Sequence, residues 1–372
     1  MRFKSKRRKF LTGAAATAAL GAPALVRAQG PIILRLQTRW PAKSLFHEYA
    51  LDYAKKVNGM TGGDVRIEVL AQGALASPSG LLDAVSKGAL DAAHGLLHAH
   101  YARHPAFALW AAGPAFGMDA NLLLAWHRYG GGAQLLARLY AAIGVDVVSY
   151  PYGPMPTQPL GWFQRPVARA QDLSRMRVRA PGMAGQIYAG LGATVDMLAP
   201  AELAGALRRG MLDGAEYNNA ASDRELGLDE AAKVYMLQSY HQSAEQFEIL
   251  FNKTKFEALP SKIRAILENA ADAASADMAW KAIDRYSKAH GDLLDDKRVR
   301  MRKTPDAVLQ RQLAAYDAAA EKHRDDPLFH EIQESQRQFA QRAVRWQLDT
   351  QVSPRLAYAR YFGRKPVPRR KR

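Results

Sequence analysis

Hydrophobic and polar positions along the chain switch between strand-like and helix-like spacing. Residues 32–37 form an apolar run typical of a strand, and apolar side chains then recur at helical spacing over 45–57 until an Asn-Gly pair at 58–59. Residues 65–69 alternate between apolar and charged side chains, which predicts a half-buried strand, and a short helix follows over 81–85. The first part of the chain is therefore expected to consist of strand–helix units.

The same order continues through the middle of the chain. We expect strands at 145–150, 176–179 and 194–198, with a helix over 182–191 between the last two. Because strands that alternate with helices form largely parallel sheets, this order predicts an α/β fold.

One pattern occurs twice, at 84–93 and at 206–215. In each copy apolar residues at helical spacing stop at a glycine, which can adopt the left-handed conformation of a helix cap. A short apolar strand then ends on a polar residue, His94 in the first copy and Glu216 in the second. Two similar α/β lobes explain this repeat, with a ligand site in the crevice between them. A chance recurrence of alanine, leucine and glycine is the alternative.

Helical spacing dominates after Pro260. Residues 261–289 lack glycine and proline and predict one long helix. A second helix is expected after the Thr304-Pro305 cap, and a third over 327–349 with an apolar stripe. These C-terminal helices pack either on a second copy of the chain, giving a homodimer, or on the two lobes of their own chain.

The first 28 residues have the pattern of an export signal. Adjacent Arg7 and Arg8 precede Phe10 and a weakly apolar, alanine-rich run, and a small-x-small pattern predicts cleavage after Ala28. These features match a twin-arginine signal peptide and therefore predict a periplasmic protein. A membrane anchor fits less well, because the apolar run is short and contains glycine and proline.

Charge and cysteine content narrow the function classes. The formal net charge of +17 includes seven basic residues of the leader, so the mature chain carries about +10, and six more basic residues belong to a tail over 364–372. Nucleic acid is therefore not an expected partner. The absence of cysteine excludes cysteine nucleophiles and thiolate metal sites.

Histidines are densest over 94–104, where pairs four residues apart could share a helix face and bind zinc. No HExxH motif accompanies them, and scattered cleft or surface histidines explain the cluster equally well. The chain also has no G-x-S-x-G nucleophile motif. The glycines at 130–132 follow no strand, so they predict a helix stop rather than a phosphate-binding loop.

Two arginines stand at a predicted strand end. Arg177 and Arg179 are two residues apart and so share one face, and Arg179 precedes the turn into the next helix. An arginine at that edge points into the crevice, where its planar fork suits a carboxylate. A surface salt bridge is the alternative for an isolated arginine, and Glu216-Tyr217 is equally ambiguous from position alone.

At these residues the sequence resembles the solute-binding component of tripartite ATP-independent periplasmic (TRAP) transporters. The resemblance is to the branch that binds 2-oxo and 2-hydroxy monocarboxylates such as pyruvate and lactate, and it covers nearly all of the mature chain. Its most specific segments are 105–109, 125–132, 161–163, 177–179, 213–217, 225–228 and 250–253.

The resemblance implies a two-lobed periplasmic binding protein fold with a hinge. Lobe I is expected at 29–152 and 245–260, and lobe II at 153–244. Residues 261–363 are expected to supply the long bracing helix and the C-terminal helices, followed by the basic tail.

The resemblance also implies a ligand site. Arg179 matches the arginine that holds the substrate carboxylate, and a cation helps to bridge substrate and protein. The cation ligands match Gln158, Glu216 and the backbone carbonyl of Tyr217, whose ring walls the pocket. Oxygen ligands of this kind suit Ca²⁺ or Na⁺.

Three positions depart from the family pattern. Gln242 stands where a further glutamate is expected, so the metal set of Gln158, Glu216, Tyr217 and Gln242 has one negative charge fewer. Pro154 replaces an asparagine, which stiffens the Gln158 loop. A tyrosine-rich wall is replaced by residues that include His98 and His100, so these two histidines are expected to contact the substrate.

The implied function is capture of a small organic acid by hinge closure and delivery to a TRAP membrane permease, without enzymatic activity. Two alternatives remain at this point. One is an exported metal-dependent hydrolase or lyase that uses Glu216 with His94 or His98, and the other is a ligand sensor with the same fold.

Overall fold

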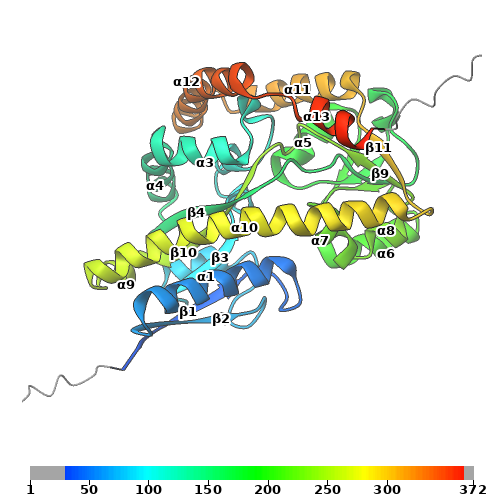
Figure 1. Cartoon of the computed structure of the whole chain (residues 1–372). Coiled ribbons are helices and arrows are strands. Elements are labelled where there is room, and N and C mark those ends of the chain that lie inside the picture. Colours follow the sequence, from blue (N-terminus) through cyan, green and yellow to red (C-terminus); the bar gives the residue numbers. More distant parts are fainter. Residues whose placement is uncertain (1–29, 364–372) are drawn as a thin grey trace, which may run out of the picture.

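The computed structural model describes residues 30–363 and has an α/β fold of two lobes, each built around one sheet. Figure 1 shows the lobes at opposite ends of the molecule, with one long helix running across both. The predicted fold class is thereby confirmed. The predicted signal peptide at 1–28 and basic tail at 364–372 lie outside the described residues.

The sheet of lobe I has five strands in the order β2-β1-β3-β10-β4. β1 is parallel to β2 and β3, whereas β10 is antiparallel to both β3 and β4, so the sheet is mixed rather than largely parallel. In chain order the strands are β1 (Ile32–Thr38), β2 (Val65–Leu70), β3 (Ala92–Leu96), β4 (Val147–Met155) and β10 (Glu245–Asn252).

Five helices belong to lobe I. The first helix continues past the Asn-Gly pair at 58–59 to Thr61, four residues beyond the predicted end at residue 57, and Gly62 caps it. Gly62 has φ 63°, the left-handed conformation that closes a helix, whereas Gly59 remains inside the helix. The glycines at 130–132 separate two helices, as predicted. The helices are α1 (Leu45–Thr61), α2 (Leu81–Ser86), α3 (Ala120–Tyr129), α4 (Gly132–Ala142) and α9 (Lys253–Glu257).

The sheet of lobe II has six strands in the order β11-β9-β5-β8-β6-β7. β5 is antiparallel to both neighbours, and β11, which follows the long helix, was not expected from the sequence. The strands are β5 (Gly161–Phe163), β6 (Arg177–Arg179), β7 (Thr194–Asp196), β8 (Gly214–Ala215), β9 (Val234–Leu237) and β11 (Arg300–Lys303). The helices are α5 (Gly182–Gly190), α6 (Leu203–Arg208), α7 (Ala220–Glu225) and α8 (Leu228–Ala231).

The sequence repeat corresponds to a structural repeat. Gly88 and Gly210 both have positive φ, at 76° and 67°, and each precedes a strand with one parallel and one antiparallel neighbour. The two strands end differently. β8 stops just before Glu216, whereas β3 continues through His94 to Leu96. His94 is therefore an interior strand residue rather than a strand-end residue.

Two chain crossings and one helix join the lobes. Residues 156–160 connect β4 to β5, and residues 238–244 connect β9 back to β10. The helix α10 (Ser261–Asp295) packs on α1 and β4 of lobe I and on α7 of lobe II, as Figure 1 shows. β4 remains in the first sheet through Met155, so the first crossing starts slightly later than expected.

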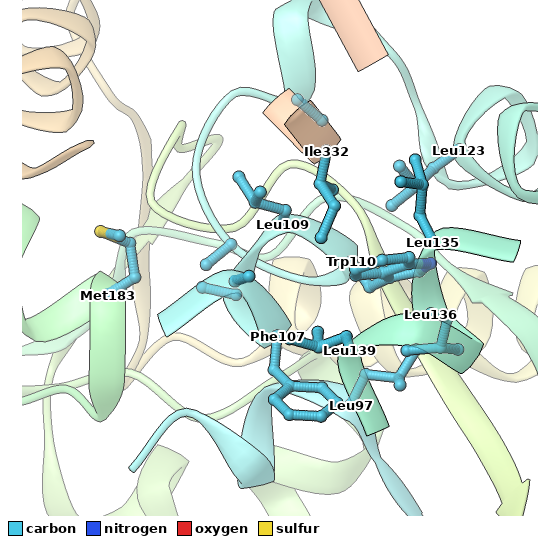
Figure 2. Packing of buried hydrophobic residues seen from close by; sticks show 14 of the residues in the cluster. Leu97, Phe107, Leu109, Trp110, Leu123, Leu135, Leu136, Leu139, Met183 and Ile332 are labelled. Atoms are coloured by element: carbon cyan, nitrogen blue, oxygen red, sulfur yellow. The ribbon is translucent and has the colours of Figure 1, made fainter. Parts of the chain in front are cut away.

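The C-terminal helices pack on both lobes of their own chain. α11 (Asp306–Glu321) packs on α5, and α12 (Pro327–Thr350) packs on α3 and α4, whereas α13 (Pro354–Phe362) is exposed along its whole length. Figure 2 shows how Ile332 of α12 enters the core of lobe I beside Leu109 and Trp110. None of the helices between residues 30 and 363 combines the length and apolar character that a membrane span requires.

His94 lies in the aromatic core of lobe I. Its side chain is fully buried, its ring stacks on Phe247 with centroids 5.3 Å apart, and its Nε2 atom pairs with the Tyr152 hydroxyl. Burial lowers the pKa of His94 to about 3. A charged imidazole is costly there, so this histidine is a neutral core residue rather than a proton-transfer group of the cleft.

His94 should make the fold sensitive to acid. The unfolded chain protonates it near pH 6.5 and the folded chain does not, so its contribution to stability is complete above pH 6.5 and is lost as the pH falls toward 3. At pH 5 the expected loss is about 2 kcal/mol. Urea unfolding at pH 7.5 and pH 5 should show a smaller decline for His94→Phe than for wild type. Equal declines would contradict this assignment.

Candidate functional site

Arg179 lies at the end of β6, on the side of lobe II that faces lobe I. Its Nη1 atom donates to Glu216 Oε1 at 2.8 Å and to the Glu216 carbonyl at 3.1 Å, while its Nε atom donates to the Leu198 carbonyl at 3.2 Å. Both partners of the ion pair are buried, with side-chain exposures of 10% and 2%. No hydrogen bond within residues 30–363 uses Nη2. The guanidinium is thus held on one side and retains a donor for a further anion.

Arg177 is not part of this site. It is exposed at the other end of β6, where it contacts Asp213 at 3.6 Å and the Gly210 carbonyl. The two arginines share a strand, but only Arg179 reaches the crevice.

The two chain crossings bring Gln158 and His241 to Glu216. Gln158 Oε1 lies 3.4 Å from His241 Nε2, and Glu216 Oε2 lies 3.7 Å from the same nitrogen. All three side chains are buried. A backbone hydrogen bond ties the two crossings together: the backbone N–H of Gln158 donates to the backbone carbonyl of Gln242 at 3.1 Å. Glu216 and Gln158, which the sequence analysis named, do converge.

Asp223 of α7 fixes the segment that carries Glu216 and Tyr217. Its carboxylate accepts from the backbone amides of Asn218 at 3.0 Å and Asn219 at 3.2 Å, and from Trp162 Nε1 at 2.9 Å. Burial raises the pKa of Asp223 to about 7, although these three donors act in the opposite direction.

Tyr217 follows Glu216 and lies against lobe I. Its ring centroid is 6.3 Å from that of Phe46 in α1, and desolvation raises the pKa of its phenol. The Tyr217 ring therefore spans the seam between the lobes, while its backbone carbonyl stays beside Glu216.

Gln242 and His98 face each other across a small cavity. The Gln242 side-chain nitrogen is buried and has no hydrogen-bond partner among the described residues. Other residues that line this cavity include Tyr101, Ala108, Pro181 and Met183. No contact joins Gln242 directly to Glu216 in the described part of the chain.

Glu245 is a second buried carboxylate that the sequence analysis missed. It pairs with His98 Nδ1, and its Oε2 atom accepts from Asn218 Nδ2 at 3.3 Å and Gln158 Nε2 at 3.4 Å. Glu245 is the first residue of β10, directly after the second crossing. Because every residue of β10 is buried, the strand has no alternation of apolar and polar positions that could have identified Glu245 from the sequence.

His100 lies outside this cluster, contrary to the expected substrate contact. Its Nε2 atom is 2.5 Å from Glu248 Oε1, and the same carboxylate accepts from Tyr140 at 2.6 Å and Ser149 at 3.0 Å. These partners belong to the interior of lobe I. Because the chain turns through a 3₁₀ segment over Leu97–His100, His98 and His100 point in different directions.

Arg39 is a further basic residue near the crevice. It directly follows β1, and its Nη1 atom donates to the Pro78 carbonyl at 2.9 Å. Burial lowers its pKa, and the charge of Arg179 acts in the same direction. The strand-end rule that singled out Arg179 also applies to Arg39 and would have found it.

The histidine-rich segment does not form a zinc site. His94 is in the core, His98 and His100 pair with different glutamates, and His104 Nε2 contacts Asp326 at 3.0 Å. Within residues 30–363, no three His, Asp or Glu side chains are grouped as a metal site would require. The remaining donors for a cation are oxygens of Gln158, Glu216 and Tyr217, and the side-chain oxygens of the first two both lie near His241 Nε2.

Comparison with known proteins agrees with this geometry. The model of bacterial extracellular solute-binding protein family 7 (DctP) matches residues 36–325. The monocarboxylate 2-oxoacid-binding periplasmic protein all3028 of Nostoc sp. is 28% identical over 323 residues, which are 86% of this chain and 87% of that protein.

Solved structures of TRAP solute-binding proteins are also similar. One from Bordetella bronchiseptica, with calcium and picolinate, has a TM-score of 0.81 and 25% identity, covering 90% of this chain and 97% of that one. One from Colwellia psychrerythraea, with calcium and pyruvate, has the same TM-score and identity, and the match covers 89% of this chain and 100% of that one. One from Pseudoalteromonas atlantica, with sodium and pyruvate, has a TM-score of 0.80 at 25% identity and covers 89% and 99%. The chain belongs to family 7 of the bacterial extracellular solute-binding proteins, the solute-binding components of TRAP transporters.

Proposed function

We propose that the protein captures a small 2-oxo or 2-hydroxy monocarboxylate between its lobes and delivers it to a TRAP membrane permease. The observation that carries this proposal is the buried guanidinium of Arg179, whose Nη2 makes no hydrogen bond within the described chain and whose charge acts on Arg39 of lobe I. A carboxylate at Nη2 would receive a charge-assisted hydrogen bond in a desolvated site.

Lobe closure supplies the rest of the binding energy in this proposal. The carboxylate loses its hydration when it is buried, and only a paired charge with directed hydrogen bonds offsets that cost. The structure has such closure contacts: Tyr101 of lobe I pairs with Gln186 of α5, and Met183 of α5 joins the lobe I core. Opening about the crossings at 156–160 and 238–244 would separate these contacts and admit the ligand.

A Ca²⁺ or Na⁺ ion is proposed to assist binding, because the solved structures named above hold calcium or sodium together with their ligands. Gln158, Glu216 and the Tyr217 carbonyl would hold it, because the first two side chains both lie beside His241 and all three groups offer the oxygen atoms that such cations prefer. The ion would supply positive charge for the ligand's oxygens. Gln242 lies in the neighbouring cavity as a neutral amide, so we expect weak dependence on the cation.

His98 is proposed to bound the ligand pocket, because it lines the cavity between the lobes and pairs with the buried Glu245. His100 is not proposed for this role. Enzymatic catalysis is not proposed either, because the family consists of solute-binding proteins and, within residues 30–363, no hydrogen bond or ion pair joins the buried His94 to Glu216. No feature of residues 30–363 favours the sensor alternative.

Export to the periplasm through the twin-arginine pathway is proposed from the sequence of residues 1–28. It accords with the extracellular location of the family.

A homodimer through the C-terminal helices is also proposed. The outer surface of α12 and the whole of α13 expose large apolar side chains that the rest of residues 30–363 leaves uncovered, and a second copy would bury them. These side chains are Trp346, Leu348, Leu356, Tyr358, Tyr361 and Phe362.

Arg179 substitutions test the central contact. Arg179→Ala should weaken pyruvate binding by about 100-fold or more, because it also leaves Glu216 unpaired in a buried site. Arg179→Lys should weaken pyruvate binding by about tenfold, because lysine keeps the positive charge but lacks the planar set of N–H donors of the guanidinium. Isothermal titration calorimetry measures both. Arg177→Ala is the matched control and should bind like wild type; unchanged affinity in Arg179→Ala would refute the proposal.

Gln242 substitution tests the cation. In wild type, EDTA should weaken pyruvate binding by less than about tenfold. In Gln242→Glu, EDTA should weaken pyruvate binding by more than this, because a buried carboxylate requires a compensating cation. The measurement is ligand-induced thermal stabilisation with calcium, sodium or EDTA. Gln242→Leu is the control, because it replaces the side chain without adding a charge. Complete loss of wild-type binding in EDTA would contradict the expected weak dependence.

The dimer is tested by sedimentation. We expect the mature chain to sediment as a dimer, and both Trp346→Glu and a chain ending at residue 350 to sediment as monomers, because a buried charge or a missing helix removes the apolar contact. Leu75→Glu, which changes an exposed apolar residue of lobe I, should leave the dimer intact. A monomeric wild type would exclude this interface.

A further inference from the structure

His241 occupies a central position that neither the sequence analysis nor the proposed function explains. It lies on the crossing at 238–244, and its side chain is fully buried. One ring nitrogen, Nδ1, is 2.5 Å from Ser239 Oγ. The other, Nε2, faces the oxygens of Gln158 and Glu216 at 3.4 Å and 3.7 Å. The imidazole therefore bridges the crossing and the proposed ligand site.

The hydrogen bonds of Ser239 determine which imidazole nitrogen carries the proton. Ser239 Oγ accepts from Gln312 Nε2 at 2.8 Å and from the His241 backbone amide at 3.1 Å. A hydroxyl has two acceptor positions and one proton to donate. With both acceptor positions filled, the Ser239 proton points to His241 Nδ1, which must accept it. The neutral ring then carries its own proton on Nε2.

Gln312 is itself held in one orientation. Its side-chain oxygen accepts from the Tyr240 backbone amide at 2.9 Å, so its NH₂ group must face Ser239. Gln312 is fully buried and comes from α11, which packs on lobe II. The neighbouring backbone is also constrained, because Gln238 has φ 68° and the His241 carbonyl accepts from Gly113 at 2.8 Å.

We infer that His241 is a positioning residue for the ligand site, held as the Nε2–H tautomer by Ser239 and Gln312. Its N–H group faces the Gln158 side-chain oxygen at 3.4 Å and the Glu216 carboxylate at 3.7 Å and holds both oxygens in place beside Arg179. This inference rests on the proposed function for its effect on binding, but its tautomer can be measured without any ligand.

The opposite tautomer would disturb the site. An unprotonated Nε2 would present a lone pair to the oxygens of Gln158 and Glu216, and acceptors that face each other repel. Glu216 would turn away, and Arg179 would lose the partner that orients it for the ligand. A hydrogen bond between two buried residues of lobe II would thus affect affinity without touching the ligand.

Two substitutions test this network in different ways. Ser239→Ala removes the donor to Nδ1 but leaves the oxygens of Gln158 and Glu216 facing Nε2, so the Nε2–H tautomer should persist. Gln312→Glu keeps the size of the side chain but replaces the NH₂ donor with an acceptor, so the Ser239 proton turns toward residue 312 and His241 must donate from Nδ1. Ser239→Thr retains the hydroxyl and is the conservative control.

The first readout is the ¹⁵N chemical shift pattern of the His241 ring in the protein without added ligand. Wild type, Ser239→Thr and Ser239→Ala should show the Nε2–H tautomer, and Gln312→Glu should show Nδ1–H. The second readout is pyruvate affinity in calcium-containing buffer, which should fall about 10- to 100-fold in Gln312→Glu and be retained in Ser239→Thr.

An Nδ1–H tautomer in wild type would overturn the inference. So would wild-type affinity in a variant whose tautomer has switched. Failure of wild type to bind any 2-oxo or 2-hydroxy acid would instead refute the proposed function, and the ring spectra would still decide the tautomer. If Gln312→Glu does not fold, the ring spectrum of wild type alone still decides the tautomer.

Discussion

A buried ion pair at the seam between the lobes governs this structure. Arg179 and Glu216 are both removed from water, so neither can lose its partner without leaving an uncompensated charge in the interior. The pair lies at adjacent strand ends of lobe II, and its surroundings supply the further hydrogen bonds that burial demands. The Leu198 carbonyl accepts from Arg179, and His241 Nε2 lies 3.7 Å from the Glu216 carboxylate. Gln158 pairs in turn with His241, and Asp223 holds the segment that follows Glu216. The proposed ligand site therefore depends on charges that the fold keeps paired.

The architecture explains how distant segments meet there. Each lobe repeats a helix, a glycine cap and a strand between one parallel and one antiparallel neighbour, and the crossings at 156–160 and 238–244 join the lobes. Both of these crossings contribute side chains to the proposed site, so a change in the angle between the lobes must move those side chains. The helix α10 limits this motion by packing on both lobes. On one face, α11 adds Gln312 to the network, which links the C-terminal region to the hinge.

Much of the fold followed from local patterns. The strand-end position of Arg179, the glycine repeat and the long helix were all visible because each depends on spacing within a short segment. The position of His241 was not, because its contacts with Gln158 and Glu216, and the contact of its partner Ser239 with Gln312, join segments that are distant in sequence. The surroundings of His100 could not be predicted for a related reason. It was expected at the ligand because it stands where the family has a tyrosine-rich wall, whereas a 3₁₀ segment turns it away from His98 and the buried Glu248 of β10 binds it.

The most direct test of this account is a crystal structure of the mature protein grown with pyruvate and calcium. The account predicts the pyruvate carboxylate in contact with Arg179 Nη2, and the cation, where present, bound by Gln158, Glu216 and the Tyr217 carbonyl. His241 Nε2 should remain within hydrogen-bonding range of Gln158 or Glu216. Pyruvate bound away from Arg179, for example beside His98 and Glu245 with the Arg179–Glu216 pair unchanged, would contradict the central claim.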